Sequence, residues 1–544
     1  MNDRQNAAHA EAADSIWSAA TVHCGMPFAT HIAVRRGRII AVGDASSICV
    51  YANGATEHHD FPTGAITAGL SDAHMHPIWG LETVRGVDLR RADSLDDVAT
   101  VLQREAGSEE QWVLGWGLDP NVFGGRGVDG RSLDPATLGK PMMLVFRDTH
   151  SAIVNSAGID VLGLSGKEVF SDGSEVAVDG DGRPTGHLKE LGAVALARAV
   201  IPEQSIEGLA ESLLALLASM AATGLVSAQA MDFDDRADEI LEEAERSRDL
   251  PVRLRLSPLI PAGTELFELP RYLHMQGRHG RRWIVEGVKF MIDGTVDTGT
   301  AWLETADSHG QGLHSLWDDV DRYADAVRYF AARGVPIATH AIGERGVRHV
   351  LDVVASLPDE MRVGAVHRIE HIESIPDETV ARFATLGVVA SMQPIHATRH
   401  GRADLTDTWA TRLGRRRAMR SMRTRDLLDA GVTLALGSDW PVVDYDPRGV
   451  IADSVLRRPF YRPDLEPIGA SQALTVREAI DAYTLGSASA RGAAGVEGRI
   501  AVGHRADFTV FGGDPLTASA EQLAVLPVLA TAIAGSRVSM RGGA

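Results

Sequence analysis

The 544-residue chain has only two cysteines, Cys24 and Cys49, and aromatic residues make up just 5% of it. Two cysteines cannot form a disulfide framework, so we expect the protein to fold in a reducing, cytoplasmic compartment. Basic residues are also scarce, because 53 lysines and arginines stand against 73 aspartates and glutamates, leaving a net charge of −20. This charge disfavours nucleic acids and anionic membranes as partners.

Long apolar runs are missing as well. The N-terminal stretch MNDRQNAAHAEAADSIW lacks a basic segment followed by an apolar one, so it does not resemble a secretory signal. The apolar stretch 524–534 contains Pro527 and is too short to span a bilayer. With 44% hydrophobic residues, the composition is that of an ordinary globular protein long enough for two or three domains.

Both ends of the chain have sequence patterns typical of β-strands. HIAVRRGRIIAVGDA near the N-terminus and GRIAVGHRADFTVFGGDP near the C-terminus alternate short apolar runs with glycine and charged turns. Their likeness predicts one composite β-sandwich domain built from residues 1–63 and 496–544. The alternative is two unrelated β segments.

The middle of the chain alternates strand-like apolar runs with amphipathic helical patterns, about eight times in all, which is typical of an α/β fold of the (β/α)8 TIM-type barrel class. We assign residues 64–83 and 223–495 to this barrel. The interval 84–222 is too long for one connection and has strand-like runs of its own, such as PMMLVFRDTH. We interpret it as an inserted α/β subdomain after barrel strand one, and as a candidate lid.

Polar residues stand at the ends of the predicted barrel strands. In GLSDAHMH, two histidines separated by one residue project to the same side of a strand. Barrel enzymes use the C-terminal ends of their strands, so these side chains should converge. Imidazoles and carboxylates suit divalent metals, zinc first, with manganese, iron, cobalt or nickel as alternatives. The competing interpretation is a set of unrelated polar residues at strand ends. The candidates are His74, His76, Lys289, His340, His371 and Asp439.

Lys289 is unusual in this set, because an ammonium group repels a metal. It lies in the apolar run GVKFM, where desolvation lowers the pKa of a lysine and frees its amine. A neutral amine can combine with CO₂ to give an anionic carbamate that is able to bridge two cations. The alternative is a buried lysine paired with Asp293 or Glu286.

Taken in order, these motifs resemble the amidohydrolase superfamily of metal-dependent hydrolases, and within it the amidohydrolase-3 group that includes YtcJ-like proteins and N-substituted formamide deformylase. GLSDAHMH, VKFMIDGTV, THAIGERG, HRIEHIE and LGSDWPV are similar to five strand motifs of the family. HSAIVNSAG, PTGHLKE and WATRLGRRRAMRSM resemble segments of the narrower group. The chain departs from the family pattern at Glu344, at His187 and in the loop DGTVDTGTAW, so no particular substrate carries over.

The resemblance implies one or two metal ions per chain. His74, His76 and Asp439 would hold one ion, His340 and His371 the other, and a carbamylated Lys289 would bridge them. Three of these residues, Asp439, Lys289 and His340, are the expected catalytic residues, with Asp439 passing a proton from the attacking water to the leaving nitrogen. The carboxylates expected to orient the imidazoles are Asp72, Glu370 and Glu344.

The implied reaction is hydrolysis of a non-peptide C–N bond, in an amide or an N-substituted formamide, by a metal-bound hydroxide. The same site would also serve esters, lactones or cyclic amides, and a further alternative is a non-catalytic binding protein on this fold. We expect a small-molecule substrate and a homo-oligomer, most simply a dimer. Residues expected to line the substrate pocket are Trp79, Trp116, His150, His187 and Trp302.

Overall fold

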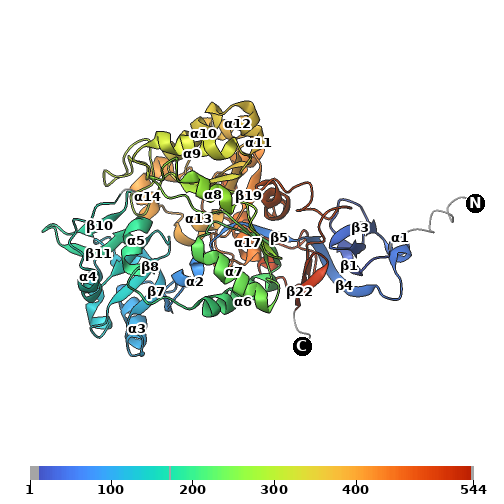
Figure 1. The fold of residues 1–544 in the computed structure, drawn as a ribbon, viewed down its shortest axis with the longest axis horizontal. Helices are drawn as coiled ribbons and strands as arrows, with labels where there is room; N and C mark the ends of the chain where they lie inside the picture. The colour runs from blue at the N-terminus through green and yellow to red at the C-terminus, as the bar shows by residue number, and fades with distance from the viewer. Residues whose placement is uncertain (1–11, 171–172, 541–544) are drawn as a thin grey trace, which may run out of the picture.

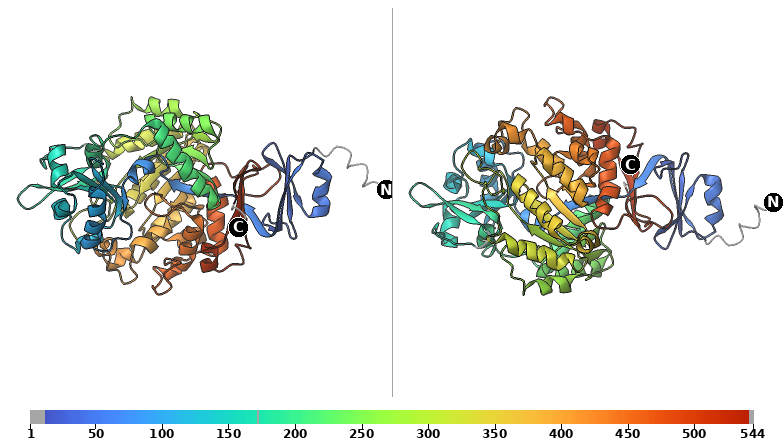
Figure 2. Two further views of the ribbon diagram at one scale, coloured as in Figure 1. Left: turned by 90° about the horizontal axis from the view of Figure 1, so that it is seen from below. Right: turned by 90° about the horizontal axis from the view of Figure 1, so that it is seen from above.

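The computed structural model describes residues 12–170 and 173–540, so the outermost parts of the predicted terminal domain, within 1–63 and 496–544, lie outside the described residues. The protein has an α/β fold with four sheets in the described part of the chain. The sheet built from both chain ends lies at one end of the molecule and the inserted sheet at the other, with two parallel sheets between them (Figure 1). Figure 2 shows the same order from two further directions.

The terminal sheet combines strands from the two ends of the chain. Its order is β22-β21-β20-β4-β1-β2-β3, and β4 pairs in parallel with β1 and antiparallel with β20. Trp17 and Phe508 are fully buried against each other beneath it, with ring centroids 4.8 Å apart. The elements are β1 (Ser15–Val22), β2 (His31–Arg35), β3 (Arg38–Gly43), α1 (Ala45–Ile48), β4 (Glu57–Ala68), β20 (Phe508–Phe511), α20 (Ala520–Ala524), β21 (Val528–Ile533) and β22 (Ser536–Met540).

The apolar run that precedes the two histidines is divided between two sheets. We expected the barrel to begin at Gly64, but residues 65–68 belong to β4 and pair with β20. The chain then crosses at Gly69 into β5 (Leu70–Met75) of a parallel sheet. A Cβ atom at Gly69 would lie 2.4 Å from Cγ2 of Val226, so only glycine allows the crossing so close to the neighbouring strand.

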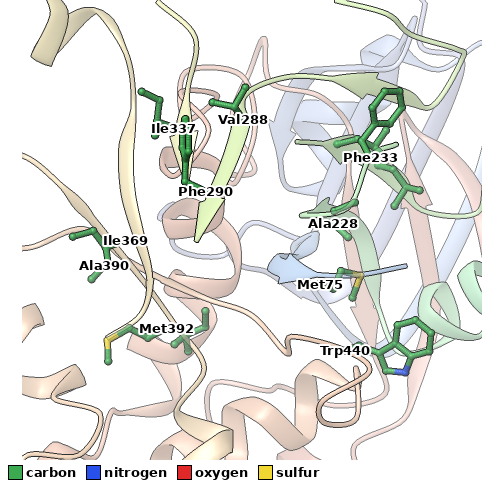
Figure 3. Close-up of a cluster of buried hydrophobic side chains, with 14 of the residues drawn as sticks. Met75, Ala228, Phe233, Val288, Phe290, Ile337, Ile369, Ala390, Met392 and Trp440 are labelled. Atoms are coloured by element: carbon green, nitrogen blue, oxygen red, sulfur yellow. The ribbon is translucent and has the colours of Figure 1, made fainter. Parts of the chain in front are cut away.

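Two parallel sheets form the centre of the molecule, in the orders β14-β13-β12-β5 and β15-β16-β17-β18-β19. Apolar residues of these strands pack into the main core, for example Phe290, Ile337 and Ile369 (Figure 3). The strands are β12 (Leu225–Ala230), β13 (Arg253–Leu256), β14 (Trp283–Val285), β15 (Val288–Met291), β16 (Ile337–Ala341), β17 (His367–His371), β18 (Val389–Met392) and β19 (Leu434–Leu436).

Helices connect these parallel strands, and most of them bury apolar residues. In α9 (Val320–Ala331), for example, Asp319 caps the N-terminus and residues such as Tyr323 and Phe330 are buried. None of the described helices combines the length and apolarity needed to cross a bilayer. The others are α2 (Trp79–Thr83), α6 (Ile206–Ala222), α7 (Asp235–Ser247), α8 (Leu269–Met275), α10 (Glu344–Ser356), α11 (Asp359–Gly364), α12 (Asp377–Leu386), α13 (Pro394–His400), α14 (Thr408–Leu413), α15 (Arg415–Ala418), α16 (Thr424–Asp429), α17 (Pro447–Leu456), α18 (Val476–Asp481) and α19 (Ser487–Ser489).

The inserted interval forms a mixed six-stranded sheet in the order β10-β11-β9-β8-β7-β6. Its last helix, α6, instead packs into the main core with the parallel sheets. The elements of the insertion are β6 (Val87–Asp88), α3 (Leu95–Ala106), β7 (Val113–Leu118), β8 (Met142–Phe146), β9 (Ser151–Val154), α4 (Ser156–Leu162), β10 (Glu175–Val178), β11 (Pro184–Lys189) and α5 (Glu190–Arg198).

Candidate metal centre

Six side chains from five parallel strands, or from the residues just after them, line a single cavity of about 260 Å³. Parallel strands run in one direction, so their C-terminal ends lie on the same edge of the sheets and their terminal side chains can meet there. These six are the residues that the sequence singled out as metal ligands: His74, His76, Lys289, His340, His371 and Asp439.

Backbone hydrogen bonds hold the first and last of these strand ends together. The Asp439 N–H donates to the carbonyl of His74 at 2.7 Å, and the His76 N–H donates to the carbonyl of Trp440 at 2.8 Å. Asp439 has a φ of +58° and His371 one of +73°, the left-handed region that non-glycine residues rarely adopt. Such strained backbone is typical of functional sites.

Asp439 is the centre of the cluster. Its Oδ1 atom lies 3.3 Å from Nε2 of His74 and 3.2 Å from Nε2 of His76, and its Oδ2 atom lies 3.8 Å from Nδ1 of His371. Ligand atoms of His74, His371 and Asp439 all lie within 4.8 Å of one another. The ring of His340 is 4.5 Å from that of His371, measured between centroids. One cation can therefore be shared by several of these groups.

The imidazoles have free nitrogens and suitable protonation states for metal binding. Nε2 of His74 and Nδ1 of His76 are buried without a hydrogen-bond partner among the described residues. Such atoms cost about 1–3 kcal/mol each unless something pairs with them. Burial lowers the pKa of His76 to about 4 and the pKa values of His340 and His371 well below the usual range. Neutral imidazole is the form that binds metals, so the donor set fits a divalent cation.

Asp439 complements these neutral rings with a negative charge. Burial alone would raise the pKa of Asp439, but the neighbouring imidazoles, His74 first, hold it well below its ordinary value. The carboxylate is therefore ionised at neutral pH and can bind a cation or accept a proton.

Lys289 is 3% exposed and makes no ion pair with either of the carboxylates that the alternative interpretation named. Glu286 pairs with Arg255, and Asp293 accepts N–H groups from Ile342 and Gly343. Burial lowers the pKa of Lys289 to about 8, although Glu370 and Asp439 act in the opposite direction. The uncharged amine that carbamate formation requires is therefore more accessible near neutral pH than in an ordinary lysine.

The three carboxylates expected to orient the imidazoles behave differently. Oε2 of Glu370 lies 2.7 Å from Nδ1 of His74, so it fixes the ring and directs Nε2 into the cavity. Asp72 accepts backbone N–H groups from His74 and Ser438 and thereby positions the backbone of two strand ends. Glu344 is 3.8 Å from Arg417 and makes no described contact with the metal-binding rings.

Two of the five expected pocket residues, Trp79 and His150, line the cavity of the ligands. The other three do not line it, because their side chains make contacts outside this cavity. Trp116 lies under the guanidinium of Arg90 and faces a different pocket. His187 packs on Phe146 and Trp302 donates its indole N–H to the carbonyl of Leu313.

A second cavity of about 100 Å³ adjoins the first and shares His150, His340, His371 and Asp439 with it. Sequence reasoning missed two of its residues, His396 and Glu373. Both residues lie near the ends of predicted strands; His396 comes just after the seventh strand, in the segment SMQPIH. The argument from strand ends could therefore have found them. Nε2 of His396 is buried without a hydrogen-bond partner among described residues and lies 3.8 Å from Oδ2 of Asp439.

Glu190 was also missed, although it ends the PTGHLKE segment of the insertion. Its Oε2 atom is 3.0 Å from Nδ1 of His150, so it leaves Nε2 of that ring free to face the cavity. Burial lowers the pKa of His150, but the carboxylates of Glu190 and Asp148 outweigh it and raise the pKa to about 8.

Comparison with known proteins agrees with this geometry. The chain is 27% identical over 504 residues to the putative amidohydrolase YtcJ of Bacillus subtilis, covering 90% of this chain and 91% of that protein. It is 25% identical over 537 residues to the N-substituted formamide deformylase of Arthrobacter pascens, covering 95% and 96%. The crystal structure of an uncharacterized metal-dependent hydrolase from Pyrococcus horikoshii shares the fold, with a TM-score of 0.71, 23% identity and coverage of 93% and 99%. The model of the amidohydrolase family matches residues 64–539, and the chain belongs to that family.

Proposed function

We propose that the protein is a metal-dependent hydrolase that cleaves a non-peptide C–N bond in an amide or an N-substituted formamide. The observation that carries this proposal is the meeting of six polar side chains in one cavity, with two buried imidazole nitrogens left without partners. The similarity to a formamide deformylase supports the choice of bond. Zinc is the first candidate metal, because imidazoles and a carboxylate predominate among the ligands.

Because ligand atoms of His74, His371 and Asp439 lie within 4.8 Å of one another, we place His371 with the first cation rather than with the second as expected from the sequence. His74, His76, His371 and Asp439 would hold that cation, and His340 and a carbamylated Lys289 would extend the site to a second. Bound there, the cations would lower the pKa of a water molecule and polarise the carbonyl of the substrate. Glu370 keeps the His74 ring in one orientation through its 2.7 Å contact. Oδ1 or Oδ2 of Asp439 would accept a proton from the attacking water and deliver it to the leaving nitrogen.

We also infer that the two parallel sheets close into a (β/α)8 barrel. At one junction, a Cβ atom on Gly437, next to β19, would lie 2.6 Å from the backbone nitrogen of His74 in β5. At the other, Leu259 forms a parallel bridge with Lys289 of β15. Closure would place the ligand-bearing strand ends around one opening, as in barrel enzymes.

The test is metal analysis of the purified protein combined with a substrate panel of N-substituted formamides, N-acyl amines, esters and cyclic amides. We expect metal to co-purify and amine release to be fastest with a formamide or simple amide. Asp439→Asn should lower kcat by about 10²–10⁴-fold. Asp444→Asn is the matched control, since Asp444 lies in the same loop, is 63% exposed and pairs with Arg90. Hydrolysis that persists in Asp439→Asn, or a panel with no C–N cleavage, contradicts the proposal.

A further inference from the structure

The cavity of the metal-binding residues extends into an apolar chamber. Its lining on that side comes from α5 of the insertion and from the loops after β12 and β13. All of these side chains are hydrocarbon or thioether groups that cannot hold a polar ligand: Leu191, Val194, Ala195, Met231, Phe233 and Leu259. A substrate with its C–N bond near Asp439 would therefore place an apolar arm here.

Arg198 is a charged exception in this apolar lining. It is the last residue of α5 and lines both this chamber and a neighbouring outer pocket. Its Nη2 donates to Oγ1 of Thr83 at 3.1 Å, and its guanidinium lies 5.0 Å from the ring centroid of Trp79. It forms no ion pair with any carboxylate in the described ranges, and the remaining N–H groups have no described acceptor.

The neighbouring carboxylates make their closest contacts with groups other than Arg198. Glu82 lies 3.2 Å from Arg85, and Glu203 lies 3.2 Å from Arg236. Asp234 caps the N-terminus of α7 through two backbone N–H groups. None of these carboxylates forms an ion pair with Arg198, although the charge of Glu82 acts on the guanidinium and opposes the lowering of its pKa by burial.

Asp232 also lines the chamber but adds little negative charge. Its Oδ2 atom accepts the backbone N–H groups of Ile78 and Trp79, and burial raises its pKa well above the ordinary value. Burial lowers the pKa of Arg198 to about 10, so the guanidinium remains charged at neutral pH. A half-buried guanidinium that makes no direct ion pair is a natural partner for an anionic ligand.

We propose that Arg198 binds an anionic group, such as a carboxylate, at the far end of an apolar arm of the substrate. The substrate class is thus an amide or N-substituted formamide that carries an acidic group at a distance from the scissile bond. This inference rests on the proposed function for the position of the C–N bond. The guanidinium offers paired N–H donors whose geometry matches a carboxylate.

Binding provides a test that does not depend on turnover. Alkanesulfonates of increasing chain length carry an anionic group that coordinates metals weakly, and 1-alkanols of equal length are their neutral counterparts. Calorimetric titration of the metal-loaded protein should show tighter binding of the sulfonates. In Arg198→Met this preference should fall by about tenfold to a hundredfold, the usual effect of losing a charged hydrogen bond. Arg85→Met is the matched control and should retain the preference, because Arg85 lines only the outer pocket.

Turnover provides the second test. N-formyl derivatives of ω-amino carboxylic acids should have a higher kcat/KM for formate release than N-alkylformamides of equal length, and Arg198→Met should remove the difference. Equal effects on charged and neutral compounds, or no effect, overturn the inference even if formamides are hydrolysed. If no amide is cleaved but sulfonate binding still depends on Arg198, the proposed function fails while the anion site stands. Arg198→Gln repeats both measurements if the methionine variant does not fold.

Discussion

The carboxylate of Glu370 on β17 lies 2.7 Å from Nδ1 of His74 on β5, although the two residues are 296 positions apart in the chain. Arg368 also contacts Glu370, and together with His74 it holds the pKa of this carboxyl well below the ordinary value, although burial opposes the shift. The carboxylate is therefore ionised at neutral pH. A permanent acceptor at this position keeps the proton of His74 on Nδ1 and the lone pair on Nε2.

We predict that Glu370→Gln weakens metal binding by about 10- to 100-fold, because a neutral amide no longer fixes the ring of His74 as strongly. Titration with a metal-competing chelator measures the affinity. Glu344→Gln is the control, since Glu344 is also buried but does not touch the metal-binding rings. Equal affinities in Glu370→Gln and the wild-type protein would show that the pair has no part in metal binding.

Lys289→Met should lower the metal content of the protein and reduce activity by at least about tenfold, since methionine fills a similar volume but cannot form a carbamate. NMR of the metal-loaded protein in ¹³C-bicarbonate tests the modification directly. The wild-type protein should show a carbamate carbon signal that the variant lacks. A normal metal content in Lys289→Met, together with no carbamate signal in the wild type, would remove the bridging group from the mechanism.

Val194→Phe should shorten the apolar chamber, because Val194 is 1% exposed and lines it. We expect kcat/KM to fall for formamides with long apolar arms and to change little for those with short arms. The added volume costs about 1–3 kcal/mol of stability, so activity is measured below the melting transition. Val200→Phe is the control on the same side of the insertion, where the side chain is 45% exposed. A loss that is independent of arm length would contradict this role.

The stability of the protein should depend on pH through Asp297. Burial raises its pKa to about 7, with Arg147 opposing and Asp148 reinforcing the shift. Between the unfolded value of about 4 and this folded value, the folded state binds a proton that the unfolded state has released. The contribution of Asp297 to the free energy of unfolding is thus fully present below about pH 4 and is lost as the pH rises toward 7.

Asp297→Asn stays neutral at every pH, so its denaturation midpoint should fall less between pH 5 and 7 than that of the wild-type protein. Urea denaturation across a pH series measures the difference. Asp444→Asn serves again as control, because this exposed carboxylate is paired with Arg90 at the surface. Parallel curves for the wild-type protein and Asp297→Asn would show that Asp297 titrates normally in the folded state.

The alternation of strands and helices predicted the α/β fold and the strand ends that meet in the cavity. The argument succeeded because most of the candidate ligands lie at or just after the end of a short apolar strand, and parallel strands bring their ends to one edge. The two histidines of β17 illustrate this. His371 closes β17 and lines the cavity, whereas His367 begins the strand and is buried away from the ligands.

The pocket residues were harder to predict, because the insertion has its own sheet and its side chains reach the cavity through tertiary packing alone. His150 faces the ligands, but His187, from the neighbouring strand, packs on Phe146. Nothing in the local pattern distinguishes the two. Arg198 was missed for the same reason, since an arginine at the end of a helix usually points into solvent.

The crossing at Gly69 joins the terminal sheet directly to the parallel sheet that contains His74. β4 leaves the terminal sheet and β5 begins one residue later, only four residues before His74. In the terminal sheet, β4 is held on one side by β1 and on the other by β20, a strand from the opposite end of the chain. Truncation after residue 500 would leave one edge of β4 unpaired, and β4 leads through Gly69 directly to the candidate metal ligands on β5. The C-terminal strands thus support the candidate metal centre, and variants shortened at this end should be judged by their metal content as well as by their yield.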